Sequence, residues 1–141
     1  MRNTYYLESP FEQRANFENQ VAVLVNHERV KAGLLPLTVN EQISAIARVK
    51  CQDMRDYGYC GHQSPKYGSP FDMLDSLGVN YSYAAENVAR GQRSPQEVMD
   101  GWMNSPSHRR AILSGNYKEL GVGFIKSFNG DTYWTQLFVA R

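Results

Sequence analysis

Two histidines and one glutamate, His62, Glu86 and His108, are the residues of this chain best suited to chemistry. An imidazole can bind a metal ion, transfer a proton or form a neutral hydrogen bond. Glu86 lies in an otherwise apolar stretch, and burying its carboxylate without a partner would cost several kcal/mol. Two imidazoles would supply partners, although the intervals between the three residues match no short metal-binding motif. The three residues therefore form one candidate site.

The remaining candidate residues favour structural explanations. His27 is predicted on the surface of a helix, and position 31 is lysine, so the paired histidines of a zinc-protease helix are absent. No Gly-x-Ser-x-Gly sequence indicates a serine hydrolase. Ser64 and Ser107 adjoin prolines, where hydroxyls usually form turns or caps. Cys60 could act as a nucleophile beside a histidine, but a small core residue is the favoured interpretation.

The composition is that of a single globular domain. A length of 141 residues is near the commonest domain size, and hydrophobic residues make up 42% of the chain. The charges nearly cancel, with 15 Lys and Arg against 14 Asp and Glu, which argues against a nucleic-acid partner. No apolar run reaches the roughly 18 residues of a membrane-spanning helix. Residues 1–10 lack the apolar core of a signal peptide.

Apolar spacing and capping signals predict helices in most of the chain. The first is expected over residues 11–32, and a second opens at a capping box of Thr38 and Glu41 and ends at Gly58. Three Ser-Pro pairs predict further helix starts, because serine caps a helix and proline fits its first position. The pairs are Ser69-Pro70, Ser94-Pro95 and Ser105-Pro106. The buried face of the second helix is expected to hold Ile43, Ile46, Ala47, Cys51 and Met54.

The end of the chain predicts a β-hairpin. Apolar residues alternate with glycines over residues 120–124, and a β-rich run covers residues 132–139. Between them, Asn129-Gly130 is a strong hairpin signal because both turn residues accept a positive φ. A short strand at residues 87–89 could add to this sheet. The fold class is therefore α+β, with helices packed on a small antiparallel sheet.

Several sequence blocks resemble the CAP superfamily, which includes the cysteine-rich secretory proteins, antigen 5 and the plant pathogenesis-related proteins. The resemblance is closest to the short bacterial branch and runs from about Phe17 to the end of the chain. It implies an SCP-like CAP domain over residues 11–141, after an N-terminal extension of residues 1–10. The blocks are GHQSP at 61–65, AENVA at 85–89, GWMNSPSHR at 101–109, GVGF at 121–124 and YWTQLF at 133–138.

The resemblance implies an α-β-α sandwich with a cleft lined by a histidine–glutamate tetrad that can bind zinc or another divalent metal. His62, Glu86 and His108 match three members of the tetrad and are the implied metal ligands. In eukaryotic relatives the fourth member is a glutamate three residues after a helical tryptophan, where this chain has Ser105. Glu97 belongs to the same helix but lies about 12 Å away along its axis, so it does not inherit the role.

The implied function is that of a secreted or cell-envelope binding module with a metal-capable cleft. Its ligand would be a lipid, a peptide or an envelope component, and the chain is expected to be a monomer. One alternative is a metal-dependent hydrolase for peptides or lipid esters, with Glu86 as the catalytic base. A purely structural domain with hydrogen-bonded histidines is a third possibility.

Cys51 and Cys60 are the two cysteines of the chain. A reversal after Gly58 could bring their Cα atoms to the roughly 5.5–6 Å that a disulfide requires. Two separate small core residues are the favoured interpretation, so we expect free thiols.

Overall fold

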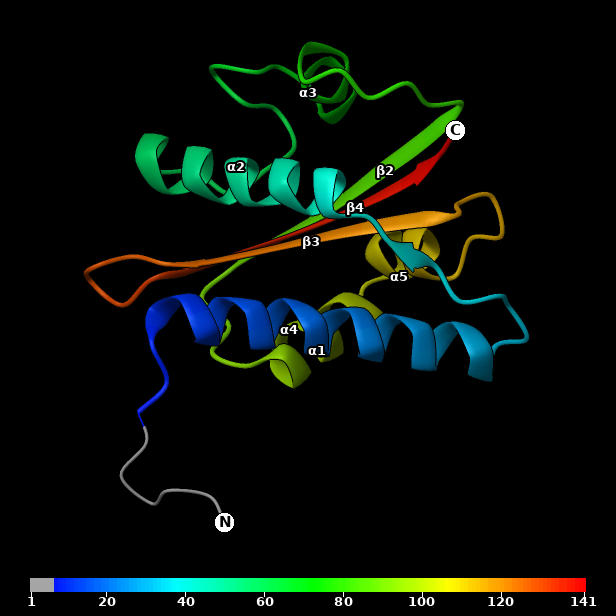
Figure 1. The fold of residues 1–141 in the computed structure, drawn as a ribbon, viewed down its shortest axis with the longest axis horizontal. Coiled ribbons are helices and arrows are strands. Elements are labelled where there is room, and N and C mark those ends of the chain that lie inside the picture. Colours follow the sequence, from blue (N-terminus) through cyan, green and yellow to red (C-terminus); the bar gives the residue numbers. More distant parts are fainter. Residues whose placement is uncertain (1–6) are drawn as a thin grey trace.

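The computed structural model describes residues 7–141, which form a three-layer sandwich around one sheet. Figure 1 shows α2 and α3 on one face of the sheet and α1, α4 and α5 on the other. The predicted α-β-α sandwich is confirmed. The helices are α1 (Pro10–Lys31), α2 (Glu41–Tyr57), α3 (Pro70–Ser76), α4 (Pro95–Met103) and α5 (Pro106–Ile112).

The sheet has four strands in the order β1-β3-β4-β2. The strands are β1 (Thr38–Val39), β2 (Tyr83–Arg90), β3 (Glu119–Lys126) and β4 (Thr132–Ala140). The pairs β3–β4 and β4–β2 are antiparallel, whereas β1 runs parallel to β3. The expected purely antiparallel sheet is therefore corrected to a mixed one. The edges of the sheet are the short β1, which covers only one end of β3, and the longer β2.

Two predicted caps differ from the structure. Thr38 belongs to β1, and the N-cap of α2 is Asn40, whose side chain accepts a hydrogen bond from Ile43 N. Asn40 is the cap because Thr38 and Val39 form the extended strand β1, so the helix starts only after them. Ser105 precedes α5 but makes no side-chain capping bond. The first helix begins one residue earlier than predicted, at Pro10. The proposed extension, residues 1–10, lies mostly outside the described residues.

The β3–β4 turn also differs from the prediction. Gly130 has a φ of 90°, but no residue other than glycine has a positive φ among residues 7–141, so Asn129 does not. Gly130 N donates to Ser127 O, and Ser127 N donates to Asp131 O. The connection is therefore a three-residue loop with a type I turn followed by a left-handed glycine. The hairpin itself is confirmed.

Two core regions hold the sandwich together. The larger lies between the sheet and α1, α4 and α5, and includes Trp102 and Trp134. The other lies under α2 and α3, where the predicted buried face of α2 is confirmed. There α2 contacts β3 directly, because a Cβ on Gly121 or Gly123 would lie 2.4 Å from the backbone of α2. These glycines therefore set the spacing between helix and sheet.

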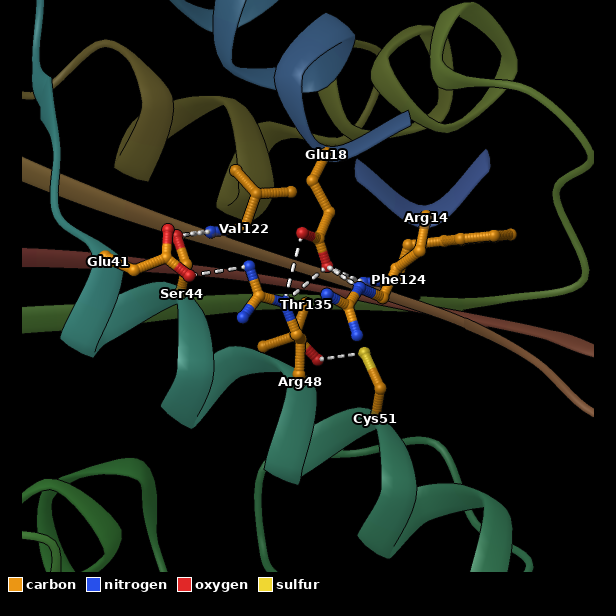
Figure 2. A network of polar contacts seen from close by, with 9 residues as sticks. All are labelled: Arg14, Glu18, Glu41, Ser44, Arg48, Cys51, Val122, Phe124 and Thr135. Atoms are coloured by element: carbon orange, nitrogen blue, oxygen red, sulfur yellow. Dashed lines mark hydrogen bonds and ion pairs between the residues drawn. The ribbon is translucent and has the colours of Figure 1, made fainter. Parts of the chain in front are cut away.

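Side chains complete the hydrogen bonding of β3 beyond the short β1. Val122 N donates to Ser44 Oγ (3.2 Å), and Phe124 N donates to Glu18 Oε2 (3.1 Å). The buried Glu18 also accepts from Arg48 Nε at 3.1 and 3.0 Å. Figure 2 shows this network, in which residues of α1 and α2 meet over β3. We call this side of the sheet, with its side-chain partners, the β3 edge.

Candidate functional site

His62 and Glu86 are in direct contact although they lie far apart in the sequence. His62 Nδ1 is 2.9 Å from Glu86 Oε1. The Glu86 side chain is 1% exposed and the His62 side chain is 56% exposed. The imidazole therefore lies across the mouth of the site with its other nitrogen, Nε2, free of this bond. Of the two imidazoles expected as partners of the buried glutamate, the structure shows His62 in this role.

Strand β2 positions Glu86 beneath the imidazole. Glu86 lies opposite Leu137 in the β2–β4 register, and its neighbour Val88 packs with Cys51 and Met54 of α2. The Glu86 side chain therefore points to the α2 face of the sheet. Its second oxygen, Oε2, is buried and has no hydrogen-bond partner among the described residues. A buried carboxylate oxygen in this state is ready to accept a hydrogen bond or a cation.

A polar cluster under the loop after α2 holds His62 in place. Lys50 is 1% exposed, and its Nζ donates to Tyr59 Oη (3.1 Å) and to the His62 carbonyl (3.1 Å). Asp53 Oδ2 accepts from the Ser64 hydroxyl (2.6 Å) and from the Tyr59 hydroxyl. Burial lowers the pKa of Lys50, while the charges of Glu86 and Asp53 act in the opposite direction. The loop is therefore fixed at several points around the imidazole.

Helix α5 approaches the site from the opposite face of the sheet. Asn87 points to that face, and its Nδ2 donates to the His108 carbonyl (3.1 Å). The buried Arg29 of α1 donates to the carbonyls of Ile112 (2.9 Å) and Ser114 (2.7 Å) at the end of the helix. These bonds fix α5 in position. The backbone of His108 is thus held on the face of β2 opposite to the Glu86 side chain.

The two imidazoles have opposite pKa shifts. The hydrogen bond that His62 donates to Glu86 raises the pKa of His62 above its ordinary value of 6.5. Burial, and secondly the nearby His62, lower the pKa of His108 below 6.5. The charge of a protonated His62 thus helps to keep His108 neutral. One ring is therefore biased toward the cation and the other toward the neutral form that metals bind.

Imidazole nitrogens and carboxylate oxygens are ligands that zinc prefers, so His62, His108 and Glu86 are the residues expected to hold a divalent metal. Within residues 7–141, no three His, Cys, Asp or Glu side chains gather closely enough to hold an ion. Glu86 Oε1 is already engaged with His62 Nδ1, an arrangement in which a carboxylate orients a metal-binding histidine. His62 Nε2 and the His108 ring are then the candidate ligands. Metal binding by His62, Glu86 and His108 remains a prediction.

The other candidate residues from the sequence are not part of the His62–Glu86 site. His27 is on the surface, as expected. Glu97 is exposed and accepts from Arg93 N (2.9 Å) at the start of α4, so it has a capping role. Ser64 forms the expected turn bonds by accepting from two following backbone amides.

Cys51 and Cys60 are free thiols as predicted, but Cys60 is exposed, so its placement in the core was wrong.

Sequence reasoning missed the residues that support the site. Lys50 lies on the apolar stripe of α2, since it is seven residues after Ile43 and four before Met54. A lysine at a core position of a helix needs polar partners, and this signal could have predicted the cluster. Asp53, three residues further on, could have been found in the same way. Arg29 and Asn87 carried no such signal, because their partners are backbone carbonyls of distant segments.

The fold and the histidine–glutamate pair define a CAP-type α-β-α sandwich, and comparisons with known proteins agree. Residues 23–138 match the CAP family, the cysteine-rich secretory protein family. The chain belongs to this family, and its resemblance to the short bacterial branch is confirmed by bacterial relatives.

Two relatives come from Bacillus subtilis strain 168. The chain is 49% identical to the uncharacterized protein YkwD over 125 residues, covering 89% of this chain and 48% of YkwD. It is 36% identical to the uncharacterized membrane protein YlbC over 124 residues, covering 88% of this chain and 34% of YlbC. The chain thus spans at most about half the length of these relatives.

A solved structure has the same fold. The chain matches an extracellular protein containing a SCP domain from Bacillus anthracis strain Ames, with a TM-score of 0.86 and 26% identity. The match covers 99% of this chain and 45% of that protein. In the described part of the present chain, every helix is too short or too polar to span a membrane.

Proposed function

We propose that this CAP domain is an extracellular or cell-envelope binding module whose ligand site is built around His62, Glu86 and His108. One observation carries the proposal. A buried glutamate orients a half-exposed imidazole and keeps one oxygen without a partner. A purely structural pair would have no use for either the exposed ring or the unpaired oxygen. The extracellular SCP-domain protein of B. anthracis supports the location.

The same site is proposed to hold zinc or another divalent cation. His62 and His108 would be its protein ligands, and Glu86 would hold the His62 ring in the correct orientation. Such a bound ion would supply a positive charge for recognising an anionic or carbonyl group. A site with two protein ligands and open positions suits reversible binding better than structural stabilisation. Binding is favoured over hydrolysis because catalytic zinc sites usually have three protein ligands, and this site would have two.

Isothermal titration calorimetry with zinc chloride tests the metal part of the proposal. Wild-type protein should bind with micromolar affinity at pH 7.5, and His108→Ala should lose the heat of binding. Glu86→Gln should weaken binding by about tenfold to a hundredfold, because it orients a ligand without being one. His27→Ala is the matched control, since it removes a surface histidine. Equal heats from wild type and His108→Ala would contradict the proposal.

A further inference from the structure

The main chain of β2 faces outward at alternate residues. Gly91 N donates to Thr132 O (2.9 Å), so this opposite pair is hydrogen-bonded. Because such pairs alternate along an antiparallel ladder, Ala85 faces β4 while Ala84 and Glu86 direct their N–H and C=O groups away from the sheet. The bond from Trp102 Nε1 to the outward carbonyl of Val88 (3.2 Å) agrees with this alternation.

The outward main-chain groups of Ala84 and Glu86 have no partner among the described residues. No strand beyond β2 pairs with them, and no side chain among residues 7–141 bonds to either N–H or C=O. On the β3 edge, the outward N–H groups of Val122 and Phe124 donate to Ser44 and Glu18. An edge of this kind is a template for another strand. We call residues 83–86 of β2, with these free groups, the β2 edge.

The shape of the β2 edge favours a narrow occupant. Tyr83 is 58% exposed, but exposure falls to 7% at Glu86. The strand therefore becomes buried from Tyr83 toward Glu86, whose side chain lies under His62. A single extended chain could pair with these residues of β2. A second folded copy would reach only the exposed end, where few main-chain groups are available.

The unpaired oxygen of Glu86 adds a chemical requirement. A residue added opposite Glu86 on a neighbouring strand would direct its side chain to the same face of the sheet. Glu86 Oε2 is buried there without a donor. A lysine or arginine in that position would supply the missing hydrogen bond.

We propose that the β2 edge binds an extended peptide as a fifth strand, with main-chain bonds to Ala84 and Glu86 and a basic residue facing Glu86 Oε2. Strand addition takes its affinity from main-chain bonds and its specificity from alternate side-chain positions. The inference rests on the proposed binding function of the same site and names the class of ligand. It does not require a metal, since the peptide contacts the strand and the glutamate.

The test uses a phage library of random dodecapeptides selected on the whole wild-type chain without metal. Selected peptides should contain a basic residue, and the strongest is synthesised for fluorescence anisotropy. N-methylation of the peptide nitrogens that bond to β2 should weaken binding at least tenfold, while N-methylation of the intervening nitrogens should have little effect. This alternation depends on the peptide alone, so it holds whether or not any protein variant folds.

Two protein variants complete the test. Ala84→Pro removes an outward N–H without removing a β2–β4 bond, and should weaken peptide binding at least tenfold. Ala84→Ser keeps the N–H and should bind like wild type. Zinc calorimetry on Ala84→Pro should be unchanged, which separates the peptide inference from the metal site. No selected peptide, no alternation under N-methylation, or wild-type dimers that Ala84→Pro dissociates would each overturn the proposal.

Discussion

The outward N–H groups of β3 and of β2 differ in whether side chains accept their hydrogen bonds. On the β3 edge, Val122 and Phe124 donate to side chains of α2 and α1, and the buried Glu18 is in turn bound by Arg48. On the β2 edge, Ala84 and Glu86 have no such partners, and the Glu86 side chain retains an unpaired oxygen. Both edges contain a buried glutamate, but only one glutamate is fully paired.

The difference shows how this domain separates stability from binding. An unpaired strand edge is an aggregation hazard, which proteins reduce by covering it or by keeping it short. The β3 edge is covered by side chains from two helices. The β2 edge is short and adjacent to His62, where an unpaired group can serve a ligand. Changes at the β3 edge should therefore affect unfolding, and changes at the β2 edge should affect binding.

The largest effect is expected at the β3 edge. Glu18→Ala would leave the Arg48 guanidinium and the Phe124 N–H without their partner in a buried position. We expect the free energy of unfolding in urea to fall by about 3 kcal/mol or more. Glu18→Gln keeps an oxygen that can accept from Phe124 N and should cost less. A loss of less than 1 kcal/mol in Glu18→Ala would show that the pairing does not hold this edge.

A somewhat smaller effect is expected from a glycine of β3. Gly123→Ala places a Cβ 2.4 Å from the Ala47 backbone, so α2 and β3 must separate. The cost of such overpacking is about 1–3 kcal/mol. Gly101→Ala is the control, since nothing lies within 4 Å of that Cβ in α4. It should stabilise the protein by roughly 0.4–1 kcal/mol. Equal unfolding midpoints for the two variants would refute the close contact.

The smallest effect is expected from the ionisation of His62 at the candidate site. Because Glu86 raises the pKa of His62, the pair should stabilise the fold below pH 6.5 and lose this contribution as the pH rises through the raised pKa. His108, with its lowered pKa, acts in the opposite sense: its contribution is present above pH 6.5 and lost on acidification.

Titration of the imidazole proton resonances by NMR measures both shifts. In the wild type, His62 should titrate above 6.5 and His108 below it. In Glu86→Gln the pKa of His62 should fall, and the stability difference between wild type and variant should be larger at pH 5.5 than at pH 8.5. An unchanged His62 titration in Glu86→Gln would disprove the contact.

The fold was predictable from the sequence because its signals are local. Short capping patterns predicted the end of α2 at Gly58 and the starts of α3 and α4. The structure confirms all three. The start of α1 was missed although Ser9, Pro10 and Glu12 form the same capping pattern. Thr38 was misassigned because a single pairing with β3 outweighed its local capping preference. Strand β1 is too short to leave a periodic pattern.

The site was only partly predictable, because it depends on the strand order. The family blocks pointed to His62 and Glu86, and the structure shows them in contact. No local pattern reveals that β2 is an edge strand, or that the His108 backbone is held on the face of β2 opposite to the Glu86 side chain. The main-chain groups of Ala84 are free because the strand order places β2 at the edge of the sheet. Sequence patterns identify reactive residue types, whereas the sheet topology decides what surrounds them.

Amide hydrogen exchange followed by NMR tests the contrast between the two edges most directly. In the free protein, the Ala84 amide should exchange at least roughly tenfold faster than the Ala85 amide, after correction for intrinsic rates, because only Ala85 bonds to β4. The Val122 and Phe124 amides should be as protected as their neighbours in β3. Slow exchange at Ala84, equal to that at Ala85 and Val122, would contradict an open β2 edge.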